Sequence, residues 1–264
     1  MKKLLIPAAA AVLALCPVTA QAVLITHSGG STLFNEDYES QTLNATLDTA
    51  NINPGGNSEE WITDATASPG VGEAVNTNPP SAFQGSQFAH LSRPGGTSEV
   101  HADFATDITD GTLTVEFAGY VPSSVPGNAV PIQVRFDEDD EGVPGSDDDI
   151  AFQLRWNTND NKLYWRPSTG GNVDTGVSFV DDTWQIYKLE YNFTGTDSVI
   201  VTVDGNSSAP LDTIIEDPTL AFINMRIAQT TGEFFFDAVP EPATGVLLGF
   251  GMIAALWGLR RGGR

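Results

Sequence analysis

Hydrophobic and polar residues alternate in four stretches of the chain. A period of two places one side of a β-strand on a core and the other side in water. Each stretch therefore predicts a half-buried strand. The four stretches are residues 112–117, 150–156, 187–193 and 199–203.

Short polar segments join these stretches. Residues 157–161 lead into a further short strand at 162–166, and residues 194–196 separate the last two stretches. Links this short are typical of antiparallel hairpins. Apart from the two ends of the chain, no long segment has a helical period. With about a dozen short strands expected in roughly 215 residues, the sequence predicts an all-β fold, one antiparallel two-sheet sandwich.

The N-terminus has the organisation of a secretory signal peptide. Two lysines follow Met1, an apolar run covers residues 4–18, and the segment ends on Ala20-Gln21-Ala22. We predict a signal peptide over residues 1–22, cleaved after Ala22, with Ala20 and Ala22 as the small residues of the cleavage site. The apolar run is short for a membrane anchor. The single cysteine, Cys16, lies inside this segment, so we expect no disulfide in the mature chain.

The C-terminus combines a proline-rich tag, an apolar run and a basic cluster. Val239-Pro240-Glu241-Pro242 precedes the uncharged residues 243–259, which are followed by Arg260 and Arg261. At ~1.5 Å per residue a helix of this length spans about 25 Å, at the short end for a bilayer. We predict a transmembrane helix with its arginines in the cytoplasm and the sandwich on the other side.

Pro-Glu-Pro, then an apolar helix, then arginines at the extreme terminus resemble the PEP-CTERM sorting signal of exported bacterial proteins. The resemblance covers residues 239–264 and implies that an exosortase-type membrane protease recognises the tag and removes the tail. It also implies a Gram-negative bacterium that makes extracellular polysaccharide, a transient stay in the inner membrane, and release to the cell surface or medium. The signal residues are Val239, Pro240, Glu241, Pro242, Arg260 and Arg261.

The segment between the two ends is strongly acidic. Residues 23–239 hold 7 basic and 33 acidic residues, a net charge of −26. This charge opposes binding to nucleic acid and attracts divalent cations. Eight carboxylates lie between Asp137 and Asp149, without the spacing of an EF-hand loop. We interpret them as a solvated turn between two strands rather than an ion site.

Several of the predicted strands resemble, in order, those of the concanavalin A-like, laminin-G-like jelly roll. A tryptophan-led strand at 149–156 is followed by segments 161–165, 183–191 and 199–205, the last ending in Val203-Asp204-Gly205. Residues 34–39 resemble the first strand of such domains and residues 233–239 the last. The resemblance implies a jelly-roll domain over residues 23–238. This fold hosts lectins, enzymes and structural modules alike.

The jelly-roll resemblance also implies a structural Ca²⁺ site. In related domains the first and last strands lie side by side and hold the ion through carboxylates and carbonyls. The matching residues are Asp37, Glu39 and Asp237. Oxygen ligands of this kind suit Ca²⁺. The alternative is that these acids are solvated residues at strand edges.

Aromatic residues on one predicted hairpin are candidates for stacking on a sugar ring. They are Trp156, Tyr164 and Trp165, with Arg166 beside them. Neighbouring residues of a strand point to opposite faces, so we expect one of Tyr164 and Trp165 in the core. Tyr164 shares its face with Lys162 and Arg166 and is the better candidate. The alternative is that these rings only pack.

Catalytic motifs are weak in this chain. No strand carries the Glu-x-Asp-x-x-Glu run of jelly-roll glycanases, and we expect Glu116 and Glu190 each to stand alone on the alternating face of its strand. The histidines do not have a metal-ligand spacing. We expect a non-catalytic, exported surface or extracellular-matrix protein associated with exopolysaccharide. The alternatives are a glycan hydrolase or lyase on the same fold, and a calcium-dependent structural adhesin.

Overall fold

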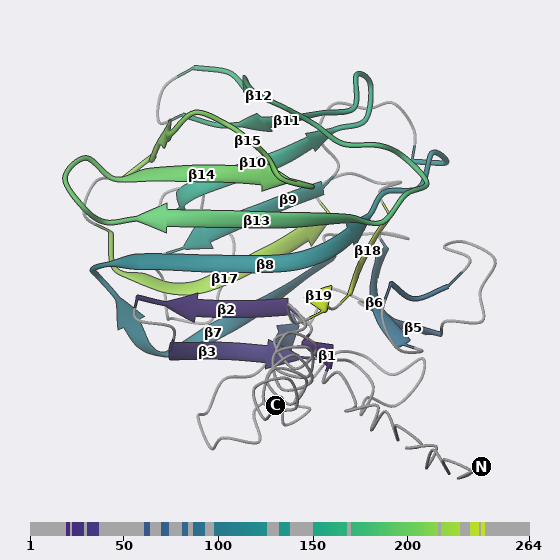
Figure 1. The fold of residues 1–264 in the computed structure, drawn as a ribbon, viewed down its shortest axis with the longest axis horizontal. Helices are drawn as coiled ribbons and strands as arrows, with labels where there is room; N and C mark the ends of the chain where they lie inside the picture. Colours follow the sequence, from purple (N-terminus) through teal and green to yellow (C-terminus); the bar gives the residue numbers. More distant parts are fainter. Residues whose placement is uncertain are drawn as a thin grey trace, which may run out of the picture. The chain divides into compact units, whose positions relative to one another are not determined.

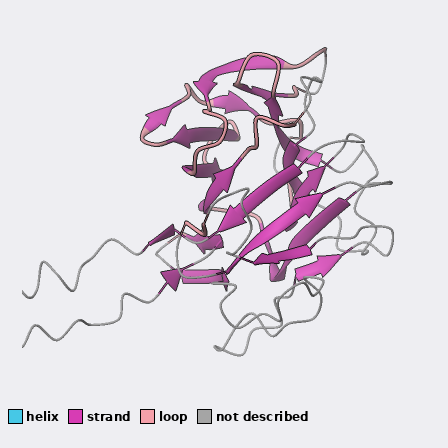
Figure 2. Ribbon diagram, turned by 90° about the vertical axis from the view of Figure 1, so that its right-hand side faces the viewer, coloured by secondary structure: helices cyan, strands magenta, loops and turns pink. Residues whose placement is uncertain are grey.

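The protein is described by a computed structural model. It covers residues 20–21, 23–28, 31–36, 61–63, 70–73, 81–83, 87–92, 98–125, 132–137, 150–167, 170–215, 218–227, 233–237 and 239–240. Every regular element in these ranges is a strand (Figure 2). The chain from Ala20 to Val239 forms one compact unit.

The alternating stretches of the sequence form strands as predicted. Buried and partly exposed residues alternate without a break along β13 and β14. The first residues of β8 alternate in the same way, and its last four residues are all buried. A strand with one buried face needs this pattern because successive side chains point to opposite sides of the sheet. The four predicted stretches correspond to β8 (Thr112–Tyr120), β10 (Ile150–Asn157), β13 (Gln185–Asn192) and β14 (Ser198–Val203).

The described strands form two large antiparallel sheets and one small sheet. The seven-stranded sheet has the order β12 (Val173–Ser178), β11 (Lys162–Trp165), β10, β9 (Ile132–Asp137), β17 (Leu220–Ile227), β7 (Ser98–Ile108) and β4 (Trp61–Thr63). The main path of the ten-stranded sheet is β15 (Asn206–Ser207), β14, β13, β8, β18 (Glu233–Asp237), β6 (Gln87–Ser92) and β5 (Gly70–Glu73). Its other strands are β16 (Leu211–Asp212), β2 (Val23–His27) and β3 (Ser31–Glu36). The two-stranded sheet joins β1 (Ala20–Gln21) and β19 (Val239–Pro240).

The predicted hairpins are present. β10 and β11 pair antiparallel across a turn that ends on Asn161, whose φ is 57°. β13 pairs with β14 in the same way. Asp204 and Gly205 join β14 to β15 with φ values of 47° and 82°. Two successive positive φ values match the right-handed twist of the strands, which explains a Val-Asp-Gly turn at this position.

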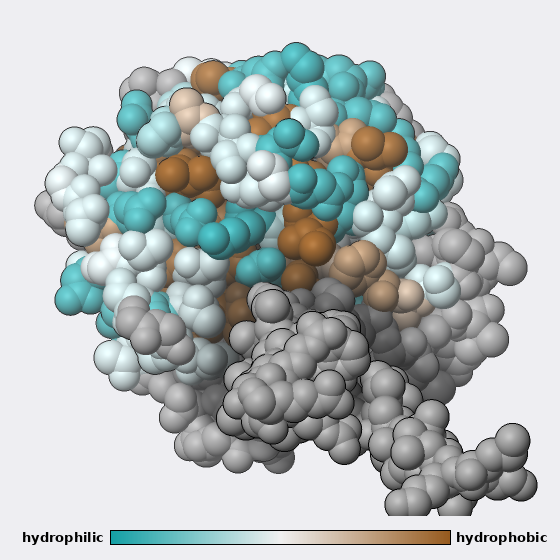
Figure 3. Space-filling view, in the orientation of Figure 1, coloured by the Kyte–Doolittle hydropathy of each residue, from teal (hydrophilic) through white to brown (hydrophobic). Residues whose placement is uncertain are grey.

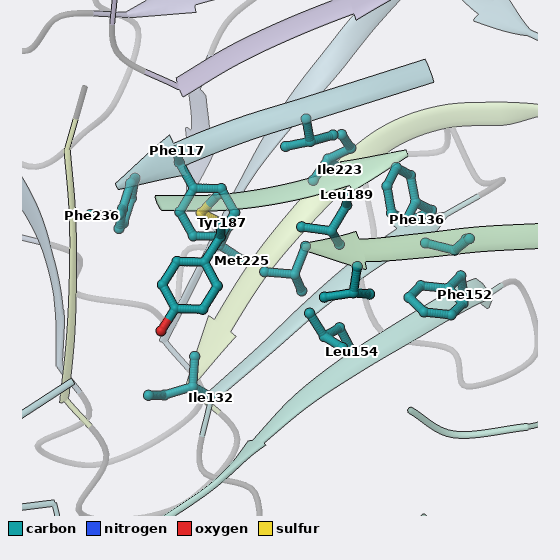
Figure 4. Close-up of a cluster of buried hydrophobic side chains, with 14 of the residues drawn as sticks. Phe117, Ile132, Phe136, Phe152, Leu154, Tyr187, Leu189, Ile223, Met225 and Phe236 are labelled. Atoms are coloured by element: carbon teal, nitrogen blue, oxygen red, sulfur yellow. The ribbon is translucent and has the colours of Figure 1, made fainter. Parts of the chain in front are cut away.

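The two large sheets pack face to face around an aromatic core. In Figure 1, β8, β13 and β14 are drawn in front of β9, β10 and β17. The ring centroid of Trp156 lies 5.4 Å from that of Tyr187 and 5.6 Å from that of Phe234. Phe117 stacks on Tyr187 at 5.4 Å. Figure 4 shows side chains of both sheets meeting in this layer. Burial of each large apolar side chain contributes about 1.5–3 kcal/mol.

The first and last strands of the domain lie end to end along one edge of β8. β2 pairs with residues 113–116 of β8, and β18 pairs with residues 118–120. The segment expected to open the fold, from Phe34, belongs partly to β3, which pairs with β2. The expectation that this strand lies beside the last strand is therefore wrong for β3. The sandwich begins one strand earlier, at Val23.

Candidate functional site

Three neighbouring strands of the seven-stranded sheet carry the same tripeptide pattern, an amide residue, a hydrophobic residue and an arginine. It occurs on β10, β9 and β17, which lie side by side in this order. The middle residues Val134, Leu154 and Met225 belong to the core, so their neighbours point to the outer face of the sheet. We call these six outward residues the amide–arginine face. They are Gln133, Arg135, Gln153, Arg155, Asn224 and Arg226.

The strand register places each arginine of this face opposite an amide. Gln133 lies opposite Arg155 on one side and opposite Arg226 on the other. Arg135 lies between Gln153 and Asn224 in the same way. Like charges directly opposite each other destabilise a sheet. The alternating arrangement separates the arginines, and on β7 Glu99 lies opposite Arg226 on its other side.

Hydrogen bonds connect the face and orient Arg155. Gln153 Nε2 donates to Gln133 Oε1 at 2.7 Å, and Arg135 Nη2 donates to the same oxygen at 3.2 Å. Arg155 Nε donates to Gln153 Oε1 at 2.9 Å, and its Nη2 donates to that oxygen as well. Arg155 Nη1 donates to Asn172 Oδ1 at 3.0 Å. The guanidinium of Arg155 is thus fixed by two amide oxygens.

The amide–arginine face is largely withdrawn from solvent although it points away from the core. Gln133, Arg135, Gln153 and Asn224 are each at most 5% exposed. Arg155 and Arg226 are half-buried. Buried polar groups are stable in folded proteins when they are hydrogen-bonded. Gln133, Gln153 and Arg135 are joined by such bonds, and the side-chain oxygen of Gln153 also accepts from the more accessible Arg155.

The row of side chains continues from Arg155 to the edge of the sheet. Tyr164 lies opposite Arg155 on one side and Asp174 on the other. Tyr164 Oη donates to Asp160 Oδ2 at 2.8 Å, and this hydrogen bond raises the pKa of Tyr164. Lys162 Nζ pairs with Asp174 Oδ2, and together with the backbone N–H of Gly176 it lowers the pKa of Asp174. At neutral pH the row presents a neutral phenol between an arginine and an ion pair.

The aromatic residues predicted to bind a glycan separate between the two sides of the sheet. Tyr164 is half-buried on the outer face, together with Lys162. Trp156 is 0% exposed and Trp165 9% exposed, and both belong to the core. The prediction that these two indoles contact a sugar is therefore wrong, because strand alternation turns them inward. Arg166 follows β11 directly, and its backbone N–H donates to Gln153 O at 3.2 Å.

Of the three predicted calcium ligands, the structure describes only Asp237. Asp37 and Glu39 lie outside the described residues, and Asp237 is fully buried near the end of β18. Within the described ranges there is no cluster of three or more histidine, cysteine or acidic residues placed to hold a metal. The structural Ca²⁺ stays a prediction.

Two glutamates that stand apart in the sequence lie on the same face of the ten-stranded sheet. Lys188 lies opposite Glu116, and its Nζ is 2.8 Å from Glu190 Oε1. Burial raises the pKa of Glu116. The view in Figure 3 shows hydrophilic and hydrophobic residues interspersed over the described surface. The expectation that Glu116 and Glu190 are isolated is wrong, because pairing of β8 with β13 brings them to one place.

Sequence reasoning missed the amide–arginine face. Each tripeptide is short, and a single amide-x-arginine is uninformative by itself. The detectable signal is its recurrence on three segments that also have a hydrophobic middle residue, at 133–135, 153–155 and 224–226. Adjacency of the three strands is a property of the sheet order, in which β17 lies beside β9 although about 80 residues separate them.

The two antiparallel sheets and their order define a jelly-roll β-sandwich of the lectin-like kind, as predicted. Three solved structures are similar to it. The endo-β-1,4-glucuronan lyase of the fungus Trichoderma reesei has a TM-score of 0.50 and 15% identity, covering 68% of this chain and 90% of that chain. The carbohydrate recognition domain of Emp47p has a TM-score of 0.43 and 15% identity, covering 74% and 91%. A sialidase has a TM-score of 0.47 and 10% identity, covering 69% of this chain but only 16% of its own. At 15% identity, the similarity to the glucuronan lyase shows the fold alone.

The C-terminal segment carries the PEP-CTERM protein-sorting motif, which matches residues 238–261. This match confirms the resemblance noted in the sequence, and it marks the chain as an exported protein that is processed by an exosortase. No curated protein matches the sequence. The described residues include no helix long and apolar enough to cross a membrane. The predicted helix at 243–259, and the predicted signal peptide apart from residues 20–21, lie outside the described residues.

Proposed function

We propose that this exported protein binds extracellular polysaccharide, without cleaving it, through the amide–arginine face and the adjoining Tyr164. The observation that carries the proposal is the fixed guanidinium of Arg155 beside the ring of Tyr164. A sugar offers hydroxyls for hydrogen bonds and an apolar ring face for stacking on an aromatic side chain. Donors that are held in place before binding lose little conformational freedom when the ligand arrives.

The sorting motif supports this proposal because it marks an exported protein, and extracellular polysaccharide lies outside the cell. Processing by an exosortase releases the domain from its membrane segment. The protein then acts at the cell surface or in the extracellular matrix. Its net charge of −26 between residues 23 and 239 keeps it soluble outside the cell.

We also propose that the protein does not cleave the polysaccharide. The phenol of Tyr164 supports this part of the proposal because it keeps its proton. A phenol that acts as general base in an elimination needs a lowered pKa, whereas the hydrogen bond to Asp160 raises the pKa of Tyr164. A hydrolase alternative would rest on Glu116 and Glu190; Lys188 lies opposite Glu116 and pairs with Glu190. Polysaccharide turnover by the protein that is lost in Glu116→Gln or Glu190→Gln would overturn the non-catalytic proposal.

Binding to a panel of polysaccharides tests the proposed function. The full chain is produced in a bacterium with an exosortase, purified after export, and sedimented with insoluble neutral and acidic polysaccharides. We expect at least one of them to retain the protein. Tyr164→Ala should lose most of the binding, whereas Tyr164→Phe keeps the ring and should retain it. Lys188→Gln, on the opposite sheet, is the control. If the polysaccharides retain Tyr164→Ala as well as they retain the parent protein, the assignment of this face is contradicted.

A further inference from the structure

The two ends of the folded sandwich meet at the middle of β8. One edge of β8 pairs with β13, and both β2 and β18 pair antiparallel with the other edge. Leu24 of β2 lies opposite Glu116, and Asp237 of β18 lies opposite Ala118. These two positions on β8 are separated by about 7 Å along a strand. The chain therefore enters β2 and leaves β18 at nearly the same place.

Both ends are anchored in the fold, and a short strand lies just outside each of them. Val23 is 1% exposed and Asp237 is 0% exposed. β1, which is Ala20–Gln21, lies before β2, and β19, which begins with Val239, lies after β18. β1 and β19 pair with each other in the two-stranded sheet. Ala20, Gln21 and Val239 all belong to the compact unit that contains the sandwich.

The paired strands belong to the two segments on which processing acts. Residues 20–21 lie at the end of the predicted signal peptide, whose cleavage after Ala22 makes Val23 the first residue of the mature chain. Val239 directly precedes Pro240-Glu241-Pro242, within the sorting motif matched at residues 238–261. The last residues of the leader are thus paired with the beginning of the sorting motif.

Pairing with β1 protects the backbone at Val239. A protease that binds its substrate as an added strand uses the same main-chain groups that a neighbouring strand uses. Cleavage of a paired segment then follows the population of its opened form. Hydrolysis after Ala22 adds water across one peptide bond, leaves a carboxylate and an amine, and detaches β1 from the domain. The detached strand does not stay bound, because even a two-stranded hairpin within one chain is only marginally stable.

We infer that removal of the N-terminal leader precedes and permits removal of the C-terminal tail. While the leader is attached, β1 holds Val239 in a strand. Once the leader has been removed, the sorting motif becomes accessible to the exosortase, which breaks a peptide bond beyond Val239 with water as the acceptor of the acyl group. A chain whose leader is uncut is not released. The inference rests on the predicted cleavage after Ala22 and on the sorting motif, and it is independent of polysaccharide binding.

The test measures tail removal in a chain whose leader cannot be cut. Ala20→Leu combined with Ala22→Leu removes the small residues that signal cleavage requires, and it leaves the backbone of β1 able to pair. The full chain is produced in a bacterium with an exosortase, and a time course of intact mass reports both ends. We expect this double variant to keep its leader and to lose its tail about tenfold more slowly than the parent, as when the accessible form is populated about a tenth of the time.

A third substitution in the double variant separates pairing from the mere presence of the leader. Gln21→Pro removes a backbone donor from β1, and proline is poorly tolerated in a paired strand. It should restore tail removal to nearly the parental rate while the leader stays attached. Gln21→Ala keeps the backbone donor and is the matched control. It should leave tail removal slow.

Three results would overturn the inference. The first is tail removal at the parental rate in the double variant. The second is equally slow removal with Gln21→Pro and Gln21→Ala, which would show that the leader acts without the pairing of β1. The third needs no variant and is read from the parent protein, as molecules that keep the leader but lack the tail, or as a mature chain that retains Ala20 and Gln21.

Discussion

Gln153 and Gln133, on neighbouring strands, are joined by a 2.7 Å hydrogen bond between their side-chain amides. The bond lies in a buried layer on the side of the sheet that faces away from the core. Gln153 also accepts from Arg155, and Gln133 accepts from Arg135. One pair of amides therefore sets the positions of two arginines.

Replacement of Gln153 by methionine should weaken both the fold and the site. Methionine has a similar length but cannot bond Gln133 or Arg155, which lose a partner in a buried layer. We expect the free energy of unfolding to fall by about 1–3 kcal/mol, and polysaccharide binding to weaken because Arg155 is less well oriented. Urea denaturation measures the first effect and sedimentation with polysaccharide the second.

Thr202→Val is the matched control for Gln153→Met. It removes an exposed hydrogen bond to Ser207 on the opposite sheet. Its effect on the free energy of unfolding should stay within about 0.5 kcal/mol. Equal stability of Gln153→Met and the parent protein, with unchanged binding, would show that the amide pair does not support Arg155.

Gly119→Ala should destabilise the core by overpacking. A Cβ at Gly119 would lie 2.8 Å from the Tyr187 ring and 2.9 Å from the Phe234 ring, and both rings are buried. We expect a loss of about 1–3 kcal/mol in the free energy of unfolding. At Gly171 a Cβ meets nothing within 4 Å, so Gly171→Ala is the control and should be nearly neutral. Denaturant titration measures the free energy of unfolding of the two variants. A similar loss at both positions would contradict the packing argument.

Alkaline pH should unfold the domain through Tyr187. Complete burial raises the pKa of this phenol well above its ordinary value of 10.0. Above pH ~10 the unfolded chain releases a proton that the folded chain retains, so the free energy of unfolding falls as pH rises. The stabilisation is fully present below that pH. Tyr187→Phe should therefore move the alkaline unfolding midpoint upward.

The measurement follows tyrosine ionisation by ultraviolet absorbance and unfolding by circular dichroism in the same titration. The last part of the absorbance change should coincide with unfolding. Tyr164→Phe removes a phenol that is only half-buried, so it should move the midpoint less than Tyr187→Phe does. Complete ionisation of all five tyrosines before any loss of structure would exclude this role for Tyr187.

Glu241→Ala should block processing at the C-terminus. Glu241 lies within the matched sorting motif, between its two prolines. We expect the variant to keep the residues that follow Pro242 and to remain in the membrane fraction of a host with an exosortase. Intact-mass measurement of the exported and membrane-bound protein checks this. Pro210→Ala, an exposed proline outside the motif, is the control. Normal release of Glu241→Ala would rule out a need for this glutamate.

The strands were predictable because their signal is local. In β13, Tyr187, Leu189 and Tyr191 alternate with polar residues, and a buried face requires that alternation wherever the strand lies in the sheet. The same rule predicts that Tyr164 and Trp165 point to opposite sides. Trp156 shares its side of the strand with the buried Leu154, so it belongs to the core although it lies close to Tyr164 in the hairpin.

The sequence by itself determined that this is an exported, strand-rich, acidic protein with a sorting motif, since hydrophobic periodicity and terminal motifs act over a few neighbouring residues. Only the tertiary structure decided which strands are neighbours. It placed Asn224 and Arg226 beside Gln133 and Arg135, and Glu116 beside Lys188. Sheet order is set by packing over long separations in the chain, so the amide–arginine face exists only once β10, β9 and β17 are paired.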